Sequence, residues 1–393
     1  MSSDGSVIVV GGGASGLSAA GALARRGIGS VVLEQDAEIG GTWARRYDRL
    51  HLHTMRDFSG LAHFPIPKRY PRYLSRDEFA AYLNEYAAHF RLTVITGATV
   101  QRIWKDGSDW AIETQSGSPS LNTLPKTAPA RRSISGDRFR ARVVVVATGQ
   151  YREPVMPAWP GRELFRGQLS HSSTYRNPQP YAGKRVLVVG AGNSGAEIAT
   201  DLATGGAAFA ALSVRTPPPI VPRDPFGLPV QRTSIVLSAL PAAVADGIGQ
   251  TTARLALGDL TRYGMPRGQF TPYRRRHVPL IDVGFVAALK QGVIAIRPGV
   301  SALTAGGATF ADGTTQEFDA IVAATGFTAG LERLIDADGL LNEAGEPLGR
   351  SGDATSMPGL YFVGFVHSLR GHLFEANRDS RRLAVHVERY LNS

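Results

Sequence analysis

Short apolar runs, each followed by a glycine-rich turn and a stretch of helical periodicity, occur twice along the chain. The first run, residues 7–10, consists of β-branched residues and predicts a buried strand, and residues 14–26 after it predict a helix. Residues 30–33 predict the next strand. A second copy begins with the apolar run 184–189 and continues with a helix from Asn193. Strand, helix and strand in this order predict an α/β fold with parallel strands.

The pattern between and after these copies predicts further short elements. Strands are expected at residues 50–54, 93–95, 99–104, 110–114, 139–147, 208–214, 293–296, 308–310, 320–324 and 360–363. Helices are expected at residues 76–90, where Ser75 is the N-terminal cap, and from about residue 374 to 391. Residues 216–292 are punctuated by proline and mostly helical, and the proline- and serine-rich residues 116–136 predict a flexible insertion.

Glycines follow the first strand with the spacing G-x-G-x-x-G. Gly11 permits a tight turn, Gly13 lets the backbone approach a pyrophosphate, and Gly16 allows the helix to pack closely on the strand. Ala14 and Ser15 begin this helix, whose free N–H groups would face that anion. The spacing also occurs in turns without ligands, but with the flanking strands and helix it indicates a dinucleotide site.

The second copy repeats the spacing. Gly190, Gly192 and Gly195 follow its strand, and Asn193 and Ser194 begin its helix. The two motifs stand about 180 residues apart, and short strands follow the second one. We therefore expect one dinucleotide-binding domain to be inserted into another, so that electrons pass between a permanently bound and an exchangeable dinucleotide.

These observations define the expected fold class, an α/β chain with two Rossmann-like dinucleotide-binding domains. The expected division is a first domain at residues 1–160 and 301–393 and a second at residues 161–300, which includes the helical subregion 216–292.

Different residues end the second strand of each copy. Glu34 stands eighteen residues after Gly16, where an acidic side chain hydrogen-bonds ribose hydroxyls. Arg215 stands twenty residues after Gly195, where an NAD site would carry an acid. An arginine there suits the 2′-phosphate of NADP, although an exposed loop arginine would look the same in the sequence.

Composition excludes several classes of protein. The chain of 393 residues has no Cys, which rules out disulfides, thiolate metal sites, iron–sulfur clusters and the cysteine-dependent disulfide reductases that share a two-nucleotide layout. The net charge of +10 comes from scattered arginines with a single triple at residues 274–276, so we expect a solvated surface and no nucleic-acid partner. No apolar run approaches the ~20 residues of a membrane span, and no basic stretch precedes the N-terminal small residues, so a cytoplasmic protein is expected.

A motif between the two copies resembles a family fingerprint. Residues 165–175 read Phe165-Arg-Gly-Gln-Leu-Ser-His171-Ser-Ser-Thr-Tyr175, which is similar to the FxGxxxHxxx(Y/F/W) motif of class B flavin-dependent monooxygenases. Tyr175 and Arg176 stand where a Baeyer–Villiger enzyme has Trp-Pro. The chain most closely resembles the plant YUCCA-type branch of the flavin-containing monooxygenases, and residues 47–53, 190–195, 279–284, 319–327 and 359–365 carry further matches.

The resemblance implies which residues hold the cofactors. FAD would lie against Gly11, Gly13, Ala14, Ser15, Gly16, Glu34, Gly41, Thr42, Trp43, Thr148 and Gly149, and NADPH against Gly190, Gly192, Asn193, Ser194, Gly195 and Arg215. Thr325, Gly326 and Gly364 are further cofactor-binding candidates. Two residues are candidates for catalysis. Asn193 would hydrogen-bond across the junction of nicotinamide and flavin, or only form the first turn of its helix. His53 falls where microsomal members carry an Asn near the flavin, whereas local reasoning would make it a histidine satisfied by its neighbours.

The activity implied by the resemblance is oxygenation. NADPH would reduce the flavin, which would react with O2 to a C4a-(hydro)peroxide and insert one oxygen atom into a small organic substrate. N- or S-oxygenation is the first expectation, and oxidative decarboxylation of a 2-oxo acid or Baeyer–Villiger oxidation is the alternative. A second alternative is an NADPH oxidase or dehydrogenase without oxygen insertion. No metal site is expected.

Overall fold

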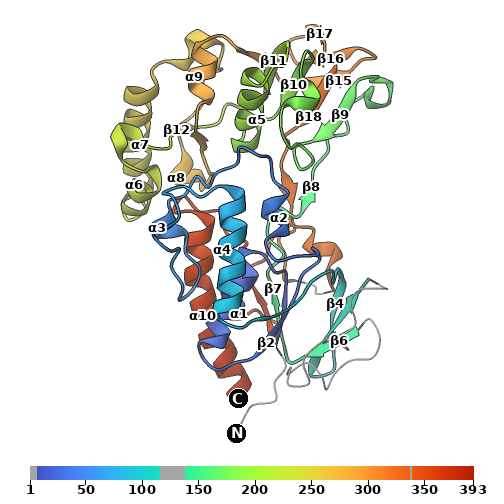
Figure 1. Cartoon of the computed structure of the whole chain (residues 1–393), viewed down its shortest axis with the longest axis vertical. Helices are drawn as coiled ribbons and strands as arrows, with labels where there is room; N and C mark the ends of the chain where they lie inside the picture. Colours follow the sequence, from blue (N-terminus) through green and yellow to red (C-terminus); the bar gives the residue numbers. More distant parts are fainter. Residues whose placement is uncertain (1–6, 116–137, 337–338) are drawn as a thin grey trace.

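Two five-stranded parallel sheets organise the chain in the computed structural model, which describes residues 7–115, 138–336 and 339–393. The first sheet has the order β21 (Leu360–Phe362), β7 (Val143–Val146), β1 (Val7–Val10), β2 (Ser30–Leu33) and β3 (Thr93–Ile95). The second has the order β14 (Ile294–Pro298), β11 (Phe209–Val214), β10 (Arg185–Val189), β18 (Ala320–Ala323) and β9 (Gln168–His171). The second sheet lies above the first along the long axis of the molecule (Figure 1). This mixed α/β fold with parallel sheets confirms the expected α/β class.

Helices cover both sheets. In the lower part, α1 (Ala14–Ala24) packs against α10 (His372–Asn392) and α4 (Arg76–His89). A capping box starts α4, because the Ser75 hydroxyl accepts from the Glu78 N–H while the Glu78 carboxylate accepts from the Ser75 N–H. In the upper part, α5 (Asn193–Thr204) lies on β10 and β11 and contacts α9 (Phe285–Lys290). Helix α10 begins two residues before the expected start.

One expected strand is in fact two. Residues 139–147 divide into β6 (Arg138–Ala141), which belongs to an antiparallel sheet with β4 (Val100–Asp106), β5 (Asp109–Thr114) and β20 (Ile335–Asp336), and β7 in the central sheet. Burial explains the division, since side chains alternate between exposed and buried along β6 but are all buried along β7. The strand expected at residues 50–54 is absent, and His51 forms only an isolated bridge with Ser75.

The chain passes between the two sheets twice, at β8 (Glu153–Pro154) and β19 (Phe327–Thr328), which pair antiparallel. Strand β18 pairs with β10 and β9, so it belongs to the second sheet. The boundary expected at residue 301 is therefore wrong, because the chain returns to the first sheet only after Gly326. The segment before β18 forms a small antiparallel crossover sheet of β15 (Val300–Leu303), β16 (Gly307–Phe310) and β17 (Thr315–Glu317).

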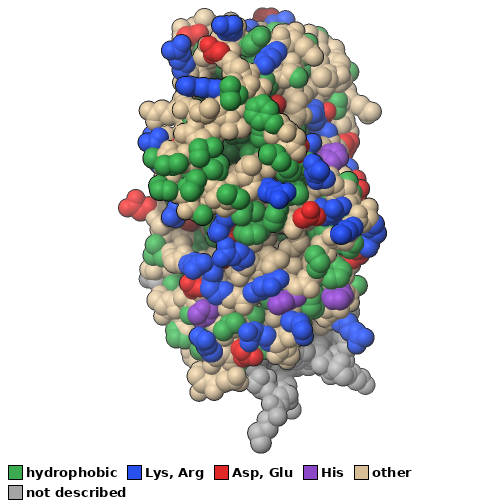
Figure 2. Space-filling model, turned by 90° about the vertical axis from the view of Figure 1, so that its left-hand side faces the viewer, with side chains coloured by type: hydrophobic (Ala, Val, Ile, Leu, Met, Phe, Trp, Pro, Cys, Tyr) green, Lys and Arg blue, Asp and Glu red, His purple; other side chains and the backbone are tan. Residues whose placement is uncertain are grey.

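The helical subregion exposes apolar side chains. It contains α6 (Val230–Leu237), α7 (Ala242–Leu257), α8 (Pro272–Arg275) and the paired strands β12 (Ile220–Pro222) and β13 (Leu280–Asp282). Helix α7 turns Ala245 and Ala253 inward, whereas Val244, Ile248 and Leu255 are exposed. Hydrophobic side chains gather in the upper half of this side of the molecule (Figure 2).

Two further sequence expectations concern the insertion and the absence of a membrane span. The flexible insertion expected at residues 116–136 lies outside the described residues. Along the part of the chain that the structure describes, no helix combines the length and the apolarity needed to cross a bilayer.

Candidate functional site

The first glycine loop connects β1 to α1 and packs against the turn at residues 147–149, which follows β7. Gly11 has φ +106°, and a Cβ atom there would lie 2.6 Å from the Ala147 carbonyl oxygen. A Cβ at Gly16 would lie 1.8 Å from the Gly11 carbonyl oxygen. A Cβ at Gly13 would meet nothing within 4 Å. Two glycines are therefore required by packing, while Gly13 leaves open space at the start of the helix, where an anionic group can approach.

Glu34 holds this loop from the end of β2. Its buried carboxylate accepts hydrogen bonds from the backbone N–H groups of Gly12, at 2.5 Å, and Asp36, at 2.8 Å. Burial raises the pKa of Glu34, and the two backbone hydrogen bonds oppose that rise. Sequence reasoning missed Asp36, which accepts from the Thr42 hydroxyl at 2.8 Å and pairs with Arg45. The sequence does show a second acidic residue just after the expected ribose-binding acid, and this spacing could have singled out Asp36.

Other residues expected around FAD gather near the same loop. Gly364, after β21, has φ +90°, and a Cβ there would lie 2.3 Å from Ser15 Oγ. The Thr148 hydroxyl is buried and has no hydrogen-bond partner among the described residues. Gly149, the next residue, has φ +81°. An unpartnered buried hydroxyl beside an open glycine loop fits a site for a polar ligand.

Trp43 packs against a ring of a neighbouring helix. It belongs to the short helix α2 (Gly41–Ala44), is half-buried, and meets the Phe79 ring of α4 edge to face, with centroids 4.6 Å apart. Thr42 is instead the polar residue of α2 that contacts the end of β2, through Asp36.

The second glycine loop repeats the geometry of the first. Gly190 has φ +112°, and a Cβ there would lie 2.4 Å from the Ala324 carbonyl oxygen. A Cβ at Gly195 would lie 1.8 Å from the Gly190 carbonyl oxygen, while a Cβ at Gly192 would meet nothing within 4 Å. Ser194 lies in the first turn of α5. The second loop is therefore open at its helix start as well.

Arg215 follows β11 directly and is exposed. No hydrogen bond or ion pair engages its guanidinium within the described residues. The base of its side chain packs on Gly299, where an added Cβ would lie 3.2 Å from the Arg215 Cβ. The cation is thus anchored beside the second loop with its donors free for an anion.

The side chain of Asn193 is occupied by backbone. Its Oδ1 accepts from the N–H of Ile281 at 2.7 Å, and its Nδ2 donates to the carbonyl of Pro279 at 3.2 Å. These bonds attach β13 and the helical subregion to the start of α5. Of the two roles considered for Asn193, the structural one at the helix start has observed contacts, and catalysis stays a prediction.

His171 of the fingerprint holds the turn after β18. The N–H of Ser173 donates to His171 Nδ1 at 3.1 Å, so Nε2 carries the proton and donates to the carbonyl of Gly326 at 3.1 Å. Burial lowers the pKa of His171. The hydroxyl of Thr325 donates to the carbonyl of Val155 at 2.5 Å. Thr325 and Gly326, two of the expected cofactor-binding residues, therefore lie where β8 and β19 join the two halves of the molecule.

His53 contacts the second half of the molecule. Its Nε2–H donates to Oε1 of Glu197 on α5 at 2.7 Å, and Glu197 is 4% exposed. His53 thus has a partner distant in sequence, contrary to the expectation that its neighbours satisfy it. Sequence reasoning missed Glu197, although its spacing of four from Asn193 places both on one side of the helix.

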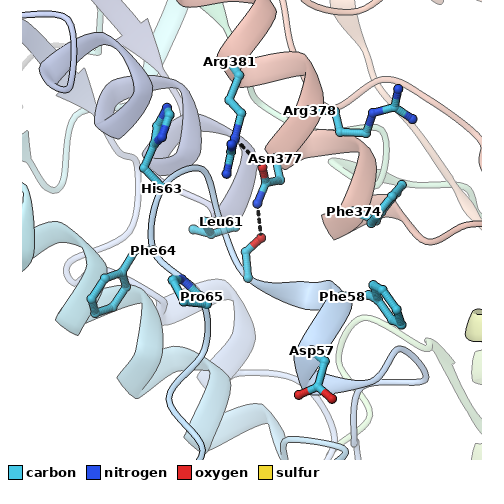
Figure 3. Close-up of a pocket in the computed structure, with 11 residues that line it drawn as sticks. Asp57, Phe58, Leu61, His63, Phe64, Pro65, Phe374, Asn377, Arg378 and Arg381 are labelled. Atoms are coloured by element: carbon cyan, nitrogen blue, oxygen red, sulfur yellow. Dashed lines mark hydrogen bonds between the residues drawn. The ribbon is translucent and has the colours of Figure 1, made fainter.

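The described residues contain no group of three His, Asp or Glu side chains able to hold a metal ion. They do contain a cleft of about 430 Å³ between α3 (Arg56–Ser59) and α10 (Figure 3). Asn377 donates to the carbonyl of Gly60 at 2.7 Å and accepts from Arg381 Nε, on the same helix, at 2.9 Å. None of the lining residues belongs to a glycine loop.

Known proteins share both the sequence and the fold. Residues 4–337 match the family described as flavin-binding monooxygenase-like. Indole-3-pyruvate monooxygenase YUCCA8 of Oryza sativa subsp. indica is 35% identical over 394 residues, covering 97% of this chain and 90% of that protein. Probable indole-3-pyruvate monooxygenase YUCCA1 of Arabidopsis thaliana is 32% identical over 396 residues, covering 97% of this chain and 89% of that protein.

Solved structures of flavin monooxygenases have a similar fold. A flavin-containing monooxygenase from Stenotrophomonas maltophilia has a TM-score of 0.70 at 26% identity and covers 98% of both chains. The closed structure of cyclohexanone monooxygenase has a TM-score of 0.70 at 20% identity, covering 98% of this chain and 85% of that one, which shows a shared fold.

Proposed function

Since the chain belongs to the flavin-binding monooxygenase-like family and is a flavin-dependent monooxygenase, we propose that its first glycine loop binds FAD and its second binds NADPH. The observation that carries this assignment is that the same open loop occurs twice, with an acid beside the first copy and an unpaired arginine beside the second. Glu34 would face the ribose of FAD, and Arg215 would bind the 2′-phosphate of NADPH.

The residues of the chain bind, orient and shield the cofactors. The bound flavin supplies the acceptance of hydride from nicotinamide and the reaction with O2. The N–H groups at the starts of α1 and α5 would hold the two pyrophosphates, and Thr148 would give its unpartnered hydroxyl to FAD. His171 keeps the Gly326 turn in place between the two sites.

The substrate class that we propose is a 2-oxo acid with an aromatic side chain. The relatives that match nearly the whole chain are named indole-3-pyruvate monooxygenases. The reaction would convert the 2-oxo acid, O2, NADPH and a proton into a carboxylic acid shorter by one carbon, CO2, water and NADP+. N- or S-oxygenation is the second candidate. S-allyl-L-cysteine S-oxygenase of Allium sativum shares the fold with a TM-score of 0.63, but at 18% identity that likeness does not extend to the substrate.

A product assay tests the proposed substrate class and the insertion of oxygen. Purified protein loaded with FAD is given NADPH and O2 with indole-3-pyruvate, an aliphatic 2-oxo acid, a thioether and a tertiary amine, and mass spectrometry identifies the products. We expect the shortened acid and CO2 from the aromatic 2-oxo acid. Oxygenation of the thioether or the amine alone would refute the substrate class and leave the monooxygenase assignment intact. NADPH consumption that yields only H2O2 with every compound would refute oxygen insertion.

A further inference from the structure

One side of α5 carries three polar residues, and two of them contact the first half of the molecule. Ser194, Glu197 and Asp201 follow one another at spacings of three and four, which places them along one stripe of the helix. The carboxylate of Asp201 accepts from the hydroxyl of Tyr175 at 2.8 Å and lies 3.8 Å from Arg49 Nη1. Glu197 accepts from His53 at 2.7 Å.

Tyr47 is a second buried residue of the 47–53 segment beside this stripe. Its side chain is 5% exposed. Burial and the adjacent, hydrogen-bonded carboxylate of Glu197 raise the pKa of Tyr47, while a hydrogen bond from Ser194 lowers it. The bond from His53 Nε2–H to Glu197 Oε1, at 2.7 Å, is the direct contact between this helix and the 47–53 segment. The second glycine loop is thereby joined to residues 47–53 of the first half.

We propose that Glu197 is a positioning residue that sets the second nucleotide loop relative to the 47–53 segment of the first half. An ionised carboxylate only accepts hydrogen bonds, and a buried one needs donors. The donor to Glu197, His53 at 2.7 Å, comes from the other half of the molecule, while Glu197 itself stands one turn beyond the loop on the same helix. This role rests on the proposed binding of NADPH at that loop.

A neighbour on the same helix provides a matched comparison. Thr200 is 5% exposed, but its hydroxyl donates to the carbonyl of Ala196 at 2.7 Å, within α5. Replacement of Thr200 changes packing and an intrahelical bond without breaking a bond between the halves. Thr200→Ala therefore controls for effects that arise from the stability of α5 alone.

The first experiment separates hydride transfer from nucleotide binding. His53→Ala, Glu197→Ala, the double variant and Thr200→Ala are loaded with FAD. Anaerobic flavin reduction by saturating NADPH and the change in flavin absorbance on titration with NADP+ are then measured. We expect each cluster variant to lose about 10- to 100-fold in reduction rate, because misplacement by about 1 Å has that cost, with the Kd for NADP+ within about threefold. The double variant should be no slower than the slower single variant. Glu197→Gln, which keeps one acceptor, should lose less than Glu197→Ala.

A reduction rate that is unchanged in Glu197→Ala, or equally reduced in Thr200→Ala, would overturn the proposal. Tyr47→Phe keeps the ring and removes only the hydroxyl, so it serves if the alanine variants do not fold, and its rate should fall by at least about threefold.

A second experiment needs neither cofactor. Unfolding of the FAD-free protein by urea is measured for the same four-variant cycle of His53 and Glu197. We expect the effects of the two single substitutions to be non-additive, and additivity would remove the contact on which the proposal depends. If the wild-type holoenzyme is not reduced by NADPH while this coupling is present, the assignment of the second loop fails and the contact between the halves stands.

Discussion

The two glycine loops have nearly the same backbone and different surroundings. Gly11 and Gly190 share a positive φ, each lies under a turn with the sequence Ala-Thr-Gly, and each is contacted by the glycine five positions later. Yet ten of the eleven residues of α1 are buried, against seven of the twelve residues of α5. Helix α1 is enclosed by α10 and α4, whereas α5 contacts the first half through the polar residues Glu197 and Asp201, which bind His53 and Arg49.

The residues beside the two loops differ in burial in the same way as the helices. Glu34 points inward and binds the backbone of its own loop, while Arg215 lies in solvent without a partner among the described residues. An enclosed site suits a nucleotide that stays bound, and an open one with a free cation suits a nucleotide that exchanges. Under the proposed assignment, the backbone motif would let each loop bind a dinucleotide, and the surroundings would determine how that nucleotide is used.

The largest expected effect is steric. Gly16→Val would force side-chain atoms against the Gly11 carbonyl and should destabilise the protein by more than about 3 kcal/mol, with loss of bound flavin. Gly195→Val meets the same obstruction at the Gly190 carbonyl, so it should destabilise the second half similarly and abolish NADPH binding, with less effect on bound flavin than Gly16→Val. Flavin absorbance after gel filtration and thermal unfolding report both. Gly13→Ala is the control, because open space surrounds its Cβ, and it should fold with weakened FAD binding.

A smaller effect is expected at the open loop. Arg215→Ala should lower the preference for NADPH over NADH in kcat/KM by roughly 10- to 100-fold, because charge-assisted hydrogen bonds of about 1.5–3 kcal/mol are lost. Flavin content should not change. Arg223→Ala is the matched control, since Arg223 already pairs with Asp224 and lies over the Tyr73 ring. Equal losses with NADH and NADPH would make Arg215 an ordinary surface arginine.

Glu34→Gln tests the hydrogen bonds that hold the first glycine loop. The amide places an N–H₂ group where the carboxylate accepts from the N–H of Gly12 or Asp36, so one buried donor loses its acceptor. We expect a loss of about 1–3 kcal/mol in the free energy of unfolding and weaker FAD binding. NADP+ affinity, measured by calorimetry, should be unaffected. A matching loss of NADP+ affinity would contradict the separation of the two sites.

The smallest effect is a pH dependence at the turn beside the second loop. The pKa of His171 is lowered in the folded protein, so between that value and about 6.5 the unfolded chain binds more protons. The contribution of His171 to stability is therefore complete above about pH 6.5 and is lost as the pH falls through the folded pKa. Urea unfolding from pH 7.5 to 5 should show His171→Gln with a weaker dependence than the wild type. An identical slope in the variant would contradict this assignment.

Local chemistry in the sequence determined much of this protein. The β-branched runs and glycine spacing correctly predicted β1, β2 and the starts of both loop helices, because a turn with positive φ and a buried strand depend on a few adjacent residues. The FxGxxxHxxx(Y/F/W) fingerprint, a local string of residues, was sufficient to indicate the family. That Arg215 follows β11 at the second loop was likewise visible in the spacing.

Only the tertiary structure decided which sheet each strand joins and which polar groups meet. The strand at residues 320–323 was expected in the first domain, but its pairing with β10 and β9 assigns it to the second sheet. Asn193 bonds to backbone 86 and 88 positions away, and His53 meets Glu197 across 144 positions. Burial of a carboxylate or an amide requires partners, but its own neighbours do not specify them. They are specified by the packing of distant helices and strands, which brings the two halves of the chain together.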